Sequence, residues 1–339
     1  MNFPCHLYML FLNEKGEIYP CPRTPVNNLI GYISDPDIVE RIIDYVPQQC
    51  ECAIGSLREA NSEEKSEGIV NFNMEIGGEC NGSCVFCFQK TLSTFRKHFP
   101  FYKDLEAFLI RLKSSKTATI FGGEVTVQPE TLRLISMMKK EIGTSVTIVT
   151  NGAIPHNNYA SLCDIIDGFQ VSFYGFNMES VRMISKLNLK QIKDFCEYLS
   201  EHNRQLDVKF VLSPLVIHEL QPFLEWSLSL NVSHVMVYYA ILPSEDYERT
   251  GRRDVSSFDN LVPEYWTPII KRVSNEVKSF FIKNKKQIQE KGINYIVNRE
   301  VLNLLEIPSS FLKELDIPQE KSISISCKAW KRILTKKEE

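Results

Sequence analysis

Strand-like and helix-like patterns alternate along the chain between residues 69 and 245. Short apolar or β-branched segments recur at 69–76, 118–121, 146–150, 169–174, 208–212 and 234–242. Amphipathic helical spacing lies between them, at 105–112, 131–142, 159–166, 189–202 and 220–229. This alternation predicts βαβ units and a parallel sheet. Six such units are fewer than the eight of a closed barrel, so we expect an α/β fold built on a partial (β/α)6 TIM-like barrel.

The segments on either side of this barrel show other patterns. Residues 7–12 and 17–19 predict two strands joined by a turn, and a polar, charge-rich stretch follows at 56–68. A long amphipathic helix is expected at 263–283. We therefore expect a small N-terminal Cys-rich hairpin module with a linker over 1–66, the barrel over 67–245, and a C-terminal helical extension over 246–339.

Composition and charge limit the functional classes. The apolar fraction of 43%, the charged fraction of 24% and the net charge of −3 are ordinary for a soluble globular protein. They weigh against a strongly basic nucleic-acid binder. No apolar run approaches the about 20 residues that a membrane helix needs. The apolar start at 1–11 lacks a preceding basic region and a following small-residue cleavage site, which disfavours a secretory signal. We expect a cytoplasmic protein that does not bind membranes.

The unusual feature of the composition is its ten cysteines. In a reducing compartment, clustered cysteines indicate metal or redox chemistry more often than disulfides. Four lie near the N-terminus, three lie close together after the first barrel strand, and three stand alone: Cys5, Cys21, Cys50 and Cys52; Cys80, Cys84 and Cys87; Cys163, Cys196 and Cys327. The last three are predicted to be buried structural thiols.

Cys80, Cys84 and Cys87 have the spacing C-x3-C-x2-C. Three thiolates on one loop hold three irons of a cubane and leave the fourth iron without a protein ligand, whereas a [4Fe–4S] cluster normally takes four cysteines. A structural zinc site needs a fourth Cys or His close by, and the next histidine, His98, is eleven residues beyond Cys87. The spacing therefore favours a cluster with one open iron over a zinc knuckle or a packed loop.

These three cysteines, with an aromatic residue at Phe86, resemble the signature of the radical S-adenosylmethionine (SAM) superfamily. The resemblance implies that SAM occupies the open iron through its amino and carboxylate groups. It also implies that an electron from the cluster breaks the sulfonium bond, which yields methionine and a 5′-deoxyadenosyl radical that abstracts a substrate hydrogen. The protein then supplies orientation and excludes water.

Further motifs follow in the order of this family, each at the end of a predicted strand. Gly122, Gly123 and Glu124 resemble its GGE motif, in which glycines let a ligand approach the backbone and a carboxylate can pair with the methionine ammonium. Asn151 and Ser172 end the next two strands, where the family uses polar residues for the ribose and carboxylate of SAM. A simple turn at Asn151 and a backbone-bonded hydroxyl at Ser172 are the alternatives. The SAM contacts that the resemblance implies are Phe86, Gly122, Gly123, Glu124, Asn151 and Ser172.

Cys5, Gly16 and Cys21 resemble the opening C-x(9–15)-G-x4-C of the SPASM and twitch extensions, which hold auxiliary iron–sulfur clusters. Cys50 and Cys52 would complete four thiols, the ligand set of one cluster. In familiar members this extension follows the barrel, whereas here it precedes it, and the downstream cysteine set of a full SPASM domain is missing. One auxiliary cluster is therefore expected, with a four-cysteine zinc site and a site without metal as the alternatives.

Three residues near strand ends are candidates for contact with substrate. Lys209 on the fifth predicted strand is a candidate contact for an anion or a carbonyl, with a surface lysine as the alternative. His218 follows that strand and is a candidate acid–base group. Tyr238 and Tyr239 lie on the sixth strand, where one ring of the pair should face the barrel interior. Tyr239 is the candidate of this pair, and core packing is the alternative.

The sequence therefore predicts an enzyme that cleaves SAM reductively and abstracts hydrogen from a small polar or heterocyclic, nucleobase-like metabolite, leading to lysis, rearrangement or dehydrogenation. The implied cofactors are a [4Fe–4S] cluster with an open iron, SAM and a second iron–sulfur cluster. The implied partner is an external electron donor such as flavodoxin or ferredoxin, and polymeric nucleic acid is disfavoured as a substrate. A peptide maturase and a non-catalytic iron–sulfur or zinc protein are the alternatives.

Overall fold

The fold is described by a computed structural model over residues 9–13, 15–19, 29–44, 71–76, 79–87, 102–112, 117–240, 267–308 and 310–317. The predictions made for Cys5, Cys21, Cys50, Cys52 and Cys327, and for the linker at 56–68, lie outside these ranges. Among the helices within them, none combines the length and the apolar character that crossing a membrane requires.

One sheet organises the described residues. Its strands are β1 Met9–Leu12, β2 Glu17–Tyr19, β3 Gly31–Tyr32, β4 Asn71–Glu75, β5 Thr117–Phe121, β6 Ser145–Thr150, β7 Gly168–Phe173, β8 Gln205–Leu212, β9 His234–Tyr239 and β10 Asn294–Val297. They pair in the order β10-β9-β8-β7-β6-β5-β4-β1-β2-β3. All pairs from β10 to β1 are parallel, and β2 pairs antiparallel with β1 and β3. The predicted α/β class is confirmed, and the sheet stays open among these strands.

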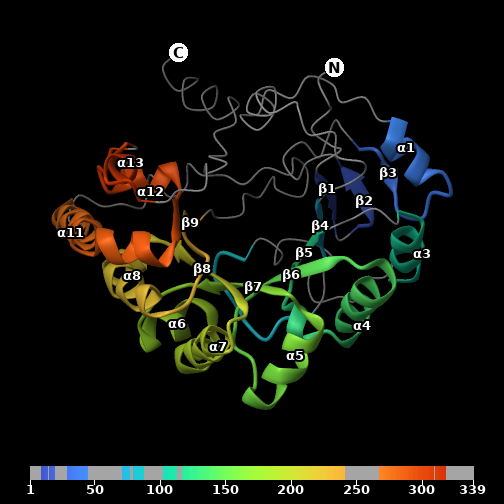
Figure 1. Ribbon diagram of the computed structural model, residues 1–339, viewed down its shortest axis with the longest axis horizontal. Coiled ribbons are helices and arrows are strands. Elements are labelled where there is room, and N and C mark those ends of the chain that lie inside the picture. Colours follow the sequence, from blue (N-terminus) through green and yellow to red (C-terminus); the bar gives the residue numbers. More distant parts are fainter. Residues whose placement is uncertain are drawn as a thin grey trace.

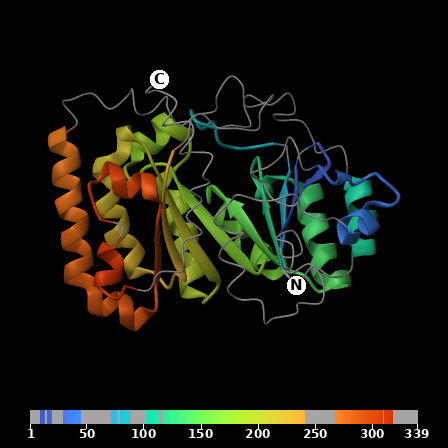
Figure 2. The ribbon, with the colours of Figure 1, turned by 90° about the horizontal axis from the view of Figure 1, so that it is seen from above.

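Helices cover the outer face of this sheet. Figure 1 shows the sheet curving, with the crossover helices along the outside of the curve. The α-helices of the described residues are α1 Ile38–Asp44, α3 Tyr102–Leu112, α4 Pro129–Met137, α5 Tyr159–Ile165, α6 Met178–Ser185, α7 Leu189–Glu201, α8 Leu220–Ser229, α11 Thr267–Lys291, α12 Arg299–Leu304 and α13 Phe311–Glu314. Seen from above, α11 stands at one end of the molecule and α1 and α3 at the other (Figure 2).

The predicted strands and hairpin are present, and two strands extend the sheet beyond the prediction. The six predicted barrel strands correspond to β4 to β9, and the hairpin corresponds to β1 and β2. In addition, β1 pairs with β4 and β10 pairs with β9, so parallel pairing continues past both ends of the predicted barrel. Parallel partners far apart in sequence leave no local turn signal, which is why the pattern did not show them.

Two helical details also differ from the prediction. The predicted helix at 131–142 is α4 followed by a π-helical turn, Met138–Ile142, that ends at Gly143. Helix α6 was not predicted, because eight residues carry too few repeats to display a period. Its N-terminus does have a sequence signal, since the Asn177 side chain accepts a hydrogen bond from the Glu179 N–H as an N-cap.

Side chains on the parallel strands alternate between a helix-covered face and an inner face. On β7, Phe169 contacts Phe195 of α7, and Phe173 contacts Phe223 of α8. Because successive strand residues point to opposite faces, the alternate residues of this strand and its end belong to the inner face, namely Gln170, Ser172 and Tyr174. Folds of this kind bind ligands where the inner face meets the carboxyl ends of the strands.

Gly152, in the loop after β6, occupies a place that only glycine fills without strain. Its φ is +71°, and a Cβ there would lie 2.7 Å from Val171 Cγ1 and 3.1 Å from Ile192 Cγ2. The left-handed conformation costs an L-residue about 1–2 kcal/mol, and overpacking adds about 1–3 kcal/mol. We expect Gly152→Ala to lower the free energy of unfolding by about 2–5 kcal/mol in chemical denaturation.

Gly143 offers a matched control for this substitution. Its φ is +75°, yet no atom lies within 4 Å of the place where a Cβ would stand. Gly143→Ala should therefore lose only the conformational part, about 1–2 kcal/mol. Equal losses for the two variants would show that the packing around Gly152 is looser than described.

Candidate functional site

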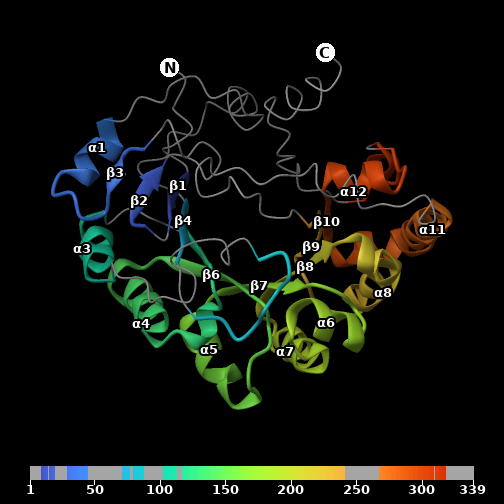
Figure 3. The same ribbon diagram turned by 180° about the vertical axis from the view of Figure 1, so that it is seen from behind.

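Residues 79–87, which we call the cluster loop, follow β4 and carry Cys80, Cys84 and Cys87. Figure 3 shows this loop in cyan, running past the ends of the central strands. None of the three forms a disulfide within the described residues, and all three are half-buried. The Gly82 N–H donates a hydrogen bond of 3.3 Å to Cys80 Sγ, which favours the thiolate form of that sulfur. The loop therefore presents three thiols on one short, turned segment.

Tyr174, directly after β7, connects the cluster loop with the inner face of the sheet. Its ring lies 5.4 Å from the Phe86 ring, centroid to centroid. Burial raises the pKa of Tyr174 well above its ordinary value, and the nearby thiols of all three cluster-loop cysteines raise the pKa further. All three thiols are thus close enough to Tyr174 to act on it electrostatically, and that tyrosine keeps its proton.

A pair of asparagines joins the cluster loop to the end of β6. Asn151 Nδ2 donates to Asn81 Oδ1 over 2.7 Å, and Asn81 Nδ2 donates to the Ala153 carbonyl over 2.9 Å. The Ala153 N–H in turn donates to Asn151 Oδ1. Asn151 is 7% exposed, so these bonds form in a partly desolvated place. Sequence reasoning proposed Asn151 as a SAM contact and did not identify Asn81, which places the cluster loop relative to β6.

The side chain of Glu124 is buried between the loops that follow β5 and β6. Its Oε1 accepts from the N–H and hydroxyl of Thr126 and from the Thr150 hydroxyl, and its Oε2 accepts from the Asn151 N–H. Burial raises the pKa of Glu124, and these hydrogen bonds oppose that rise. A carboxylate offers about four acceptor positions, so internal partners occupy most of them. In this structure the side chain links the loop after β5 to the loop after β6.

Gly122 and Gly123 turn the chain between β5 and Glu124. Their φ values are +107° and +55°, a region that glycine adopts with the least strain. The turn brings the Glu124 N–H to the Glu79 carbonyl at 2.9 Å. The GGE segment therefore lies against the beginning of the cluster loop, as a shared ligand site would require.

Two buried serines stand at the carboxyl ends of adjacent strands. Ser172 is 2% exposed and Ser213 is 3% exposed. The Ser213 hydroxyl has no hydrogen-bond partner in the described part of the chain. Buried polar groups are nearly always paired, so the Ser213 hydroxyl is a place where a ligand can bond. Sequence reasoning found Ser172 but missed Ser213, whose only signal is a small polar residue before Pro214 at a strand end.

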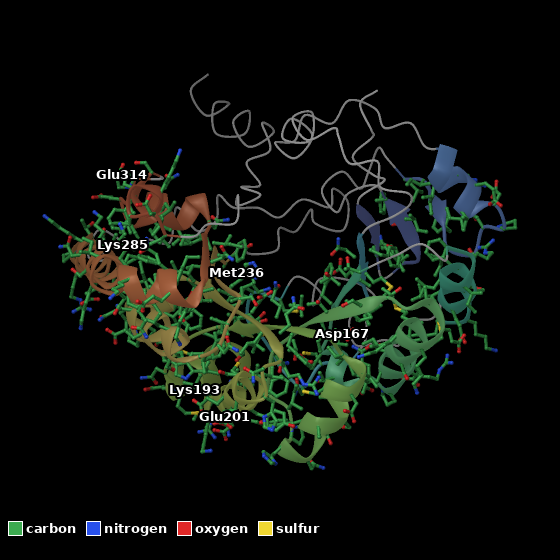
Figure 4. All side chains as sticks on the ribbon, in the orientation of Figure 1. Asp167, Lys193, Glu201, Met236, Lys285 and Glu314 are labelled. Atoms are coloured by element: carbon green, nitrogen blue, oxygen red, sulfur yellow. The ribbon has the colours of Figure 1, made fainter. Side chains whose placement is uncertain are left out.

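Lys209 lies on the inner face beside Ser172. The two residues are in register on adjacent strands, and Lys209 Nζ donates to Gln170 Oε1 over 3.4 Å. Gln170 Nε2 lies 3.6 Å from Met236 Sδ. Figure 4 shows Met236 toward the inside of the curve, whereas Lys193 of α7 points outward. Lys209 is half-buried within this polar strip, and its contact with substrate stays a prediction.

The other two substrate candidates have different surroundings. Tyr238 hydroxyl lies 3.9 Å from Met236 Sδ, so the inner-face ring of the pair is Tyr238, and Tyr239 packs against the core cluster. His218 is 48% exposed, with Nε2 3.5 Å from Glu219 Oε1. Glu219 itself is buried and accepts from the backbone N–H groups at the start of α6. The structure thus brings Tyr238, rather than Tyr239 or His218, next to Lys209.

The two isolated cysteines in the described ranges are buried, as predicted. Cys163 lies on α5 and Cys196 on α7. Burial raises the pKa of both thiols, well above its ordinary value in Cys196. A protonated, buried thiol reacts slowly and binds metal poorly. These residues are therefore structural, and they are useful control positions for the cluster-loop cysteines.

The donor set of the cluster loop fits an iron–sulfur cluster with one open iron. It supplies three thiols, one fewer than a [4Fe–4S] cluster normally takes. No three His, Cys, Asp or Glu side chains in the described ranges converge closely enough to hold a single metal ion. A cubane does not require such convergence, because each thiolate binds a different iron. Cys80, Cys84 and Cys87 are thus suited to a cluster.

Comparison with known proteins agrees with this geometry. The family model for the radical SAM superfamily matches residues 74–225, which include the cluster loop and β5 to β8. The chain resembles the crystal structure of Streptococcus suis SuiB, with a TM-score of 0.50 and 14% identity over 81% of this chain and 58% of that one. It resembles SuiB bound to S-adenosylmethionine equally, with a TM-score of 0.50 and 14% identity over 82% of this chain and 64% of that one.

A third similar structure is SuiB bound to the precursor peptide SuiA, with a TM-score of 0.50 and 16% identity over 77% of this chain and 57% of that one. At these identities the likeness is one of fold, and the chain matches less than two thirds of the length of each SuiB structure. No curated protein matches the chain in sequence. The family match and the geometry of the cluster loop agree: residues 74–225 match the radical SAM superfamily.

Proposed function

We propose that the chain is a radical SAM enzyme that cleaves SAM reductively and abstracts hydrogen from a substrate held on the inner face of the sheet. The observation that carries the proposal is the placement of three half-buried thiols near Tyr174, beside the GGE turn and a buried Ser213 hydroxyl that has no partner among the described residues. When bound, the [4Fe–4S] cluster and SAM supply hydrogen abstraction by a 5′-deoxyadenosyl radical.

Each of the site residues has its own role in this proposal. Cys80, Cys84 and Cys87 hold the cluster, and Phe86 packs on Tyr174 to close one side of it. The backbone of Gly122 and Gly123, with the Ser172 and Ser213 hydroxyls, is suited to bind the polar groups of SAM. Glu124 and Asn151 fix these loops relative to each other through their hydrogen bonds, and direct contact of either side chain with SAM is part of the proposal.

The substrate that we propose is a small polar or heterocyclic metabolite. Lys209, Gln170 and Tyr238 present an ammonium, an amide and a phenol on the inner face, next to the Ser172 position. These groups can hydrogen-bond a polar molecule, while Met236 offers it an apolar, polarizable surface. The reaction that follows hydrogen abstraction, whether lysis, rearrangement or dehydrogenation, depends on that substrate.

Electron paramagnetic resonance of the reduced, reconstituted protein tests the open iron. Addition of SAM should change the spectrum of the cluster, because the open iron gains the amino and carboxylate groups of SAM as ligands. A non-catalytic protein whose cluster already has four protein ligands would give the same spectrum with and without SAM. An unchanged spectrum would therefore contradict the proposal and favour the non-catalytic alternative.

We also propose that Cys5, Cys21, Cys50 and Cys52 hold one auxiliary iron–sulfur cluster. Cys21→Ala should lower bound iron by one cluster's worth, because a cluster needs its full set of thiolates. Iron analysis and zinc analysis of the reconstituted protein measure this, with Cys163→Ala as the matched control. Uncoupled SAM cleavage should persist in the variant. Loss of zinc at constant iron would support the four-cysteine zinc site instead.

A peptide maturase is the second candidate, and one similar structure favours it, that of SuiB bound to a precursor peptide. The two candidates differ in what stimulates SAM cleavage. If the substrate is a small metabolite, the dialysable fraction of a cell extract should raise 5′-deoxyadenosine release above the uncoupled rate. Stimulation by the peptide fraction alone would favour the maturase.

A further inference from the structure

The cluster loop rests on the last turn of helix α6. The Ser83 N–H donates to the Ser185 carbonyl at 2.7 Å, and the Val85 N–H donates to the Ile184 carbonyl at 2.9 Å. The last carbonyls of a helix lack partners within the helix, so the loop satisfies two of them. A Cβ on Gly82 would lie 3.4 Å from Leu187 Cδ2, just beyond the same helix end. The loop that holds the cluster and the end of α6 therefore form one surface.

This surface is apolar at its centre and basic at its edge. Val85, between Cys84 and Cys87, is 58% exposed, and Met183 of α6 is 52% exposed. Exposed large apolar side chains that gather at one place indicate an interaction site. Arg182 in the last turn of α6 and Lys186 at its C-cap are also exposed.

Neither basic residue is neutralised by the described part of the chain. Arg182 and Lys186 form no ion pair there, in contrast with Lys190 of α7, which pairs with Asp194 at 2.6 Å. The acid on α6 is Glu179, which lies in its first turn, away from the cluster loop. Two cations without an ion pair among the described residues thus lie at the helix end to which the cluster loop is hydrogen-bonded.

We propose that Val85, Met183, Arg182 and Lys186 form the docking surface for an acidic one-electron donor protein of the flavodoxin or ferredoxin class. This inference rests on the proposed function, which requires one electron from outside. The donor would lose one electron and the cluster would gain it, and no atom would be transferred. Electron transfer slows steeply with distance, and Val85 belongs to the segment that carries the cluster ligands. Basic side chains around an apolar centre complement an acidic partner and steer its approach.

The test compares two reductants and measures binding separately. Arg182→Glu combined with Lys186→Glu should raise the Kd for a bacterial flavodoxin at least about tenfold at low salt, because electrostatic steering changes association by about 10–1,000-fold. Biolayer interferometry on the full chain measures this Kd. Flavodoxin-driven release of 5′-deoxyadenosine should fall to a similar extent. Release driven by dithionite, a small reductant that needs no docking surface, should stay within about twofold of wild type.

Arg204→Glu combined with Lys283→Glu is the matched control, since it makes the same change in charge on residues of the loop before β8 and of α11. It should keep flavodoxin affinity within about twofold, as expected for charges outside an interface. Met183→Gln, which leaves the charges intact, should weaken flavodoxin binding by itself. Unchanged flavodoxin affinity in the double variant, or an equal loss in the control, would overturn the docking surface. A wild-type protein that releases no 5′-deoxyadenosine with dithionite would instead overturn the proposed function.

Discussion

Cys84→Ala is expected to reduce both the iron held by the cluster loop and the cleavage of SAM to background. In the proposed site three thiols of the cluster loop bind the cluster, and removing the middle one would leave two. A [4Fe–4S] cluster with two protein ligands is not retained, because each thiolate normally holds one iron. Iron analysis after anaerobic reconstitution, together with the visible absorbance of the cluster, measures the first effect, and chromatography of 5′-deoxyadenosine measures the second.

Cys163→Ala separates this effect from a general loss of stability. Cys163 is 2% exposed on α5 and belongs to the core, so its replacement costs about 1 kcal/mol of packing while it leaves the cluster loop intact. Iron content and SAM cleavage should match those of the wild type. If Cys84→Ala kept its iron and its SAM cleavage, the cluster loop would not be the site of the catalytic cluster.

Glu124→Ala is expected to lower the free energy of unfolding by about 2–6 kcal/mol, because two buried N–H groups lose their acceptor at about 1–3 kcal/mol each. These groups belong to Thr126 and Asn151, and Glu124 itself is 1% exposed. The loops after β5 and β6 would also lose their link, so SAM affinity should fall in the fraction that remains folded. Chemical denaturation and equilibrium dialysis with labelled SAM measure the two effects.

Glu130→Ala is the control for this substitution. Glu130 is an exposed carboxylate in the first turn of α4, a few residues from Glu124. Its removal should change stability by at most about 1 kcal/mol, the size of a helix-dipole contribution, and should leave SAM affinity unchanged. A Glu124→Ala protein as stable as the Glu130→Ala protein would contradict the buried network.

The fold followed from the sequence where periodicity is strong. β4 to β9 and the helices between them repeat apolar residues with periods that only strands or helices show. β10 and the pairing of β1 with β4 could not be found in this way, because parallel pairing over a long sequence distance leaves no local mark. Helix α6 was missed for a different reason, since its eight residues are too short to show a period.

The candidate site was predictable where chemistry depends on spacing along the chain. The three cluster-loop cysteines and the GGE segment are read directly from their order. The asparagine pair of Asn81 and Asn151 joins residues 70 positions apart, and no one-dimensional pattern records such a contact. The sequence also could not show which of Tyr238 and Tyr239 lies on the inner face of the sheet, because this depends on the register of β9 against β8.

Glu124 shows how the structure changes a role that sequence suggests. As part of a GGE segment, its carboxylate was expected to pair with the ammonium of SAM. The structure surrounds that carboxylate with hydrogen bonds from Thr126, Thr150 and Asn151. Glu124 is buried because it links two loops. Its replacement should therefore change the stability of the protein as well as its affinity for SAM.

The most direct measurement of the central claim is the release of 5′-deoxyadenosine from SAM by the reconstituted, dithionite-reduced protein, with Cys84→Ala as the blank. The account predicts 5′-deoxyadenosine and methionine in equal amounts from the wild type, at least at a slow uncoupled rate, and neither from the variant. An iron-loaded, reduced wild-type protein that forms neither product would contradict it.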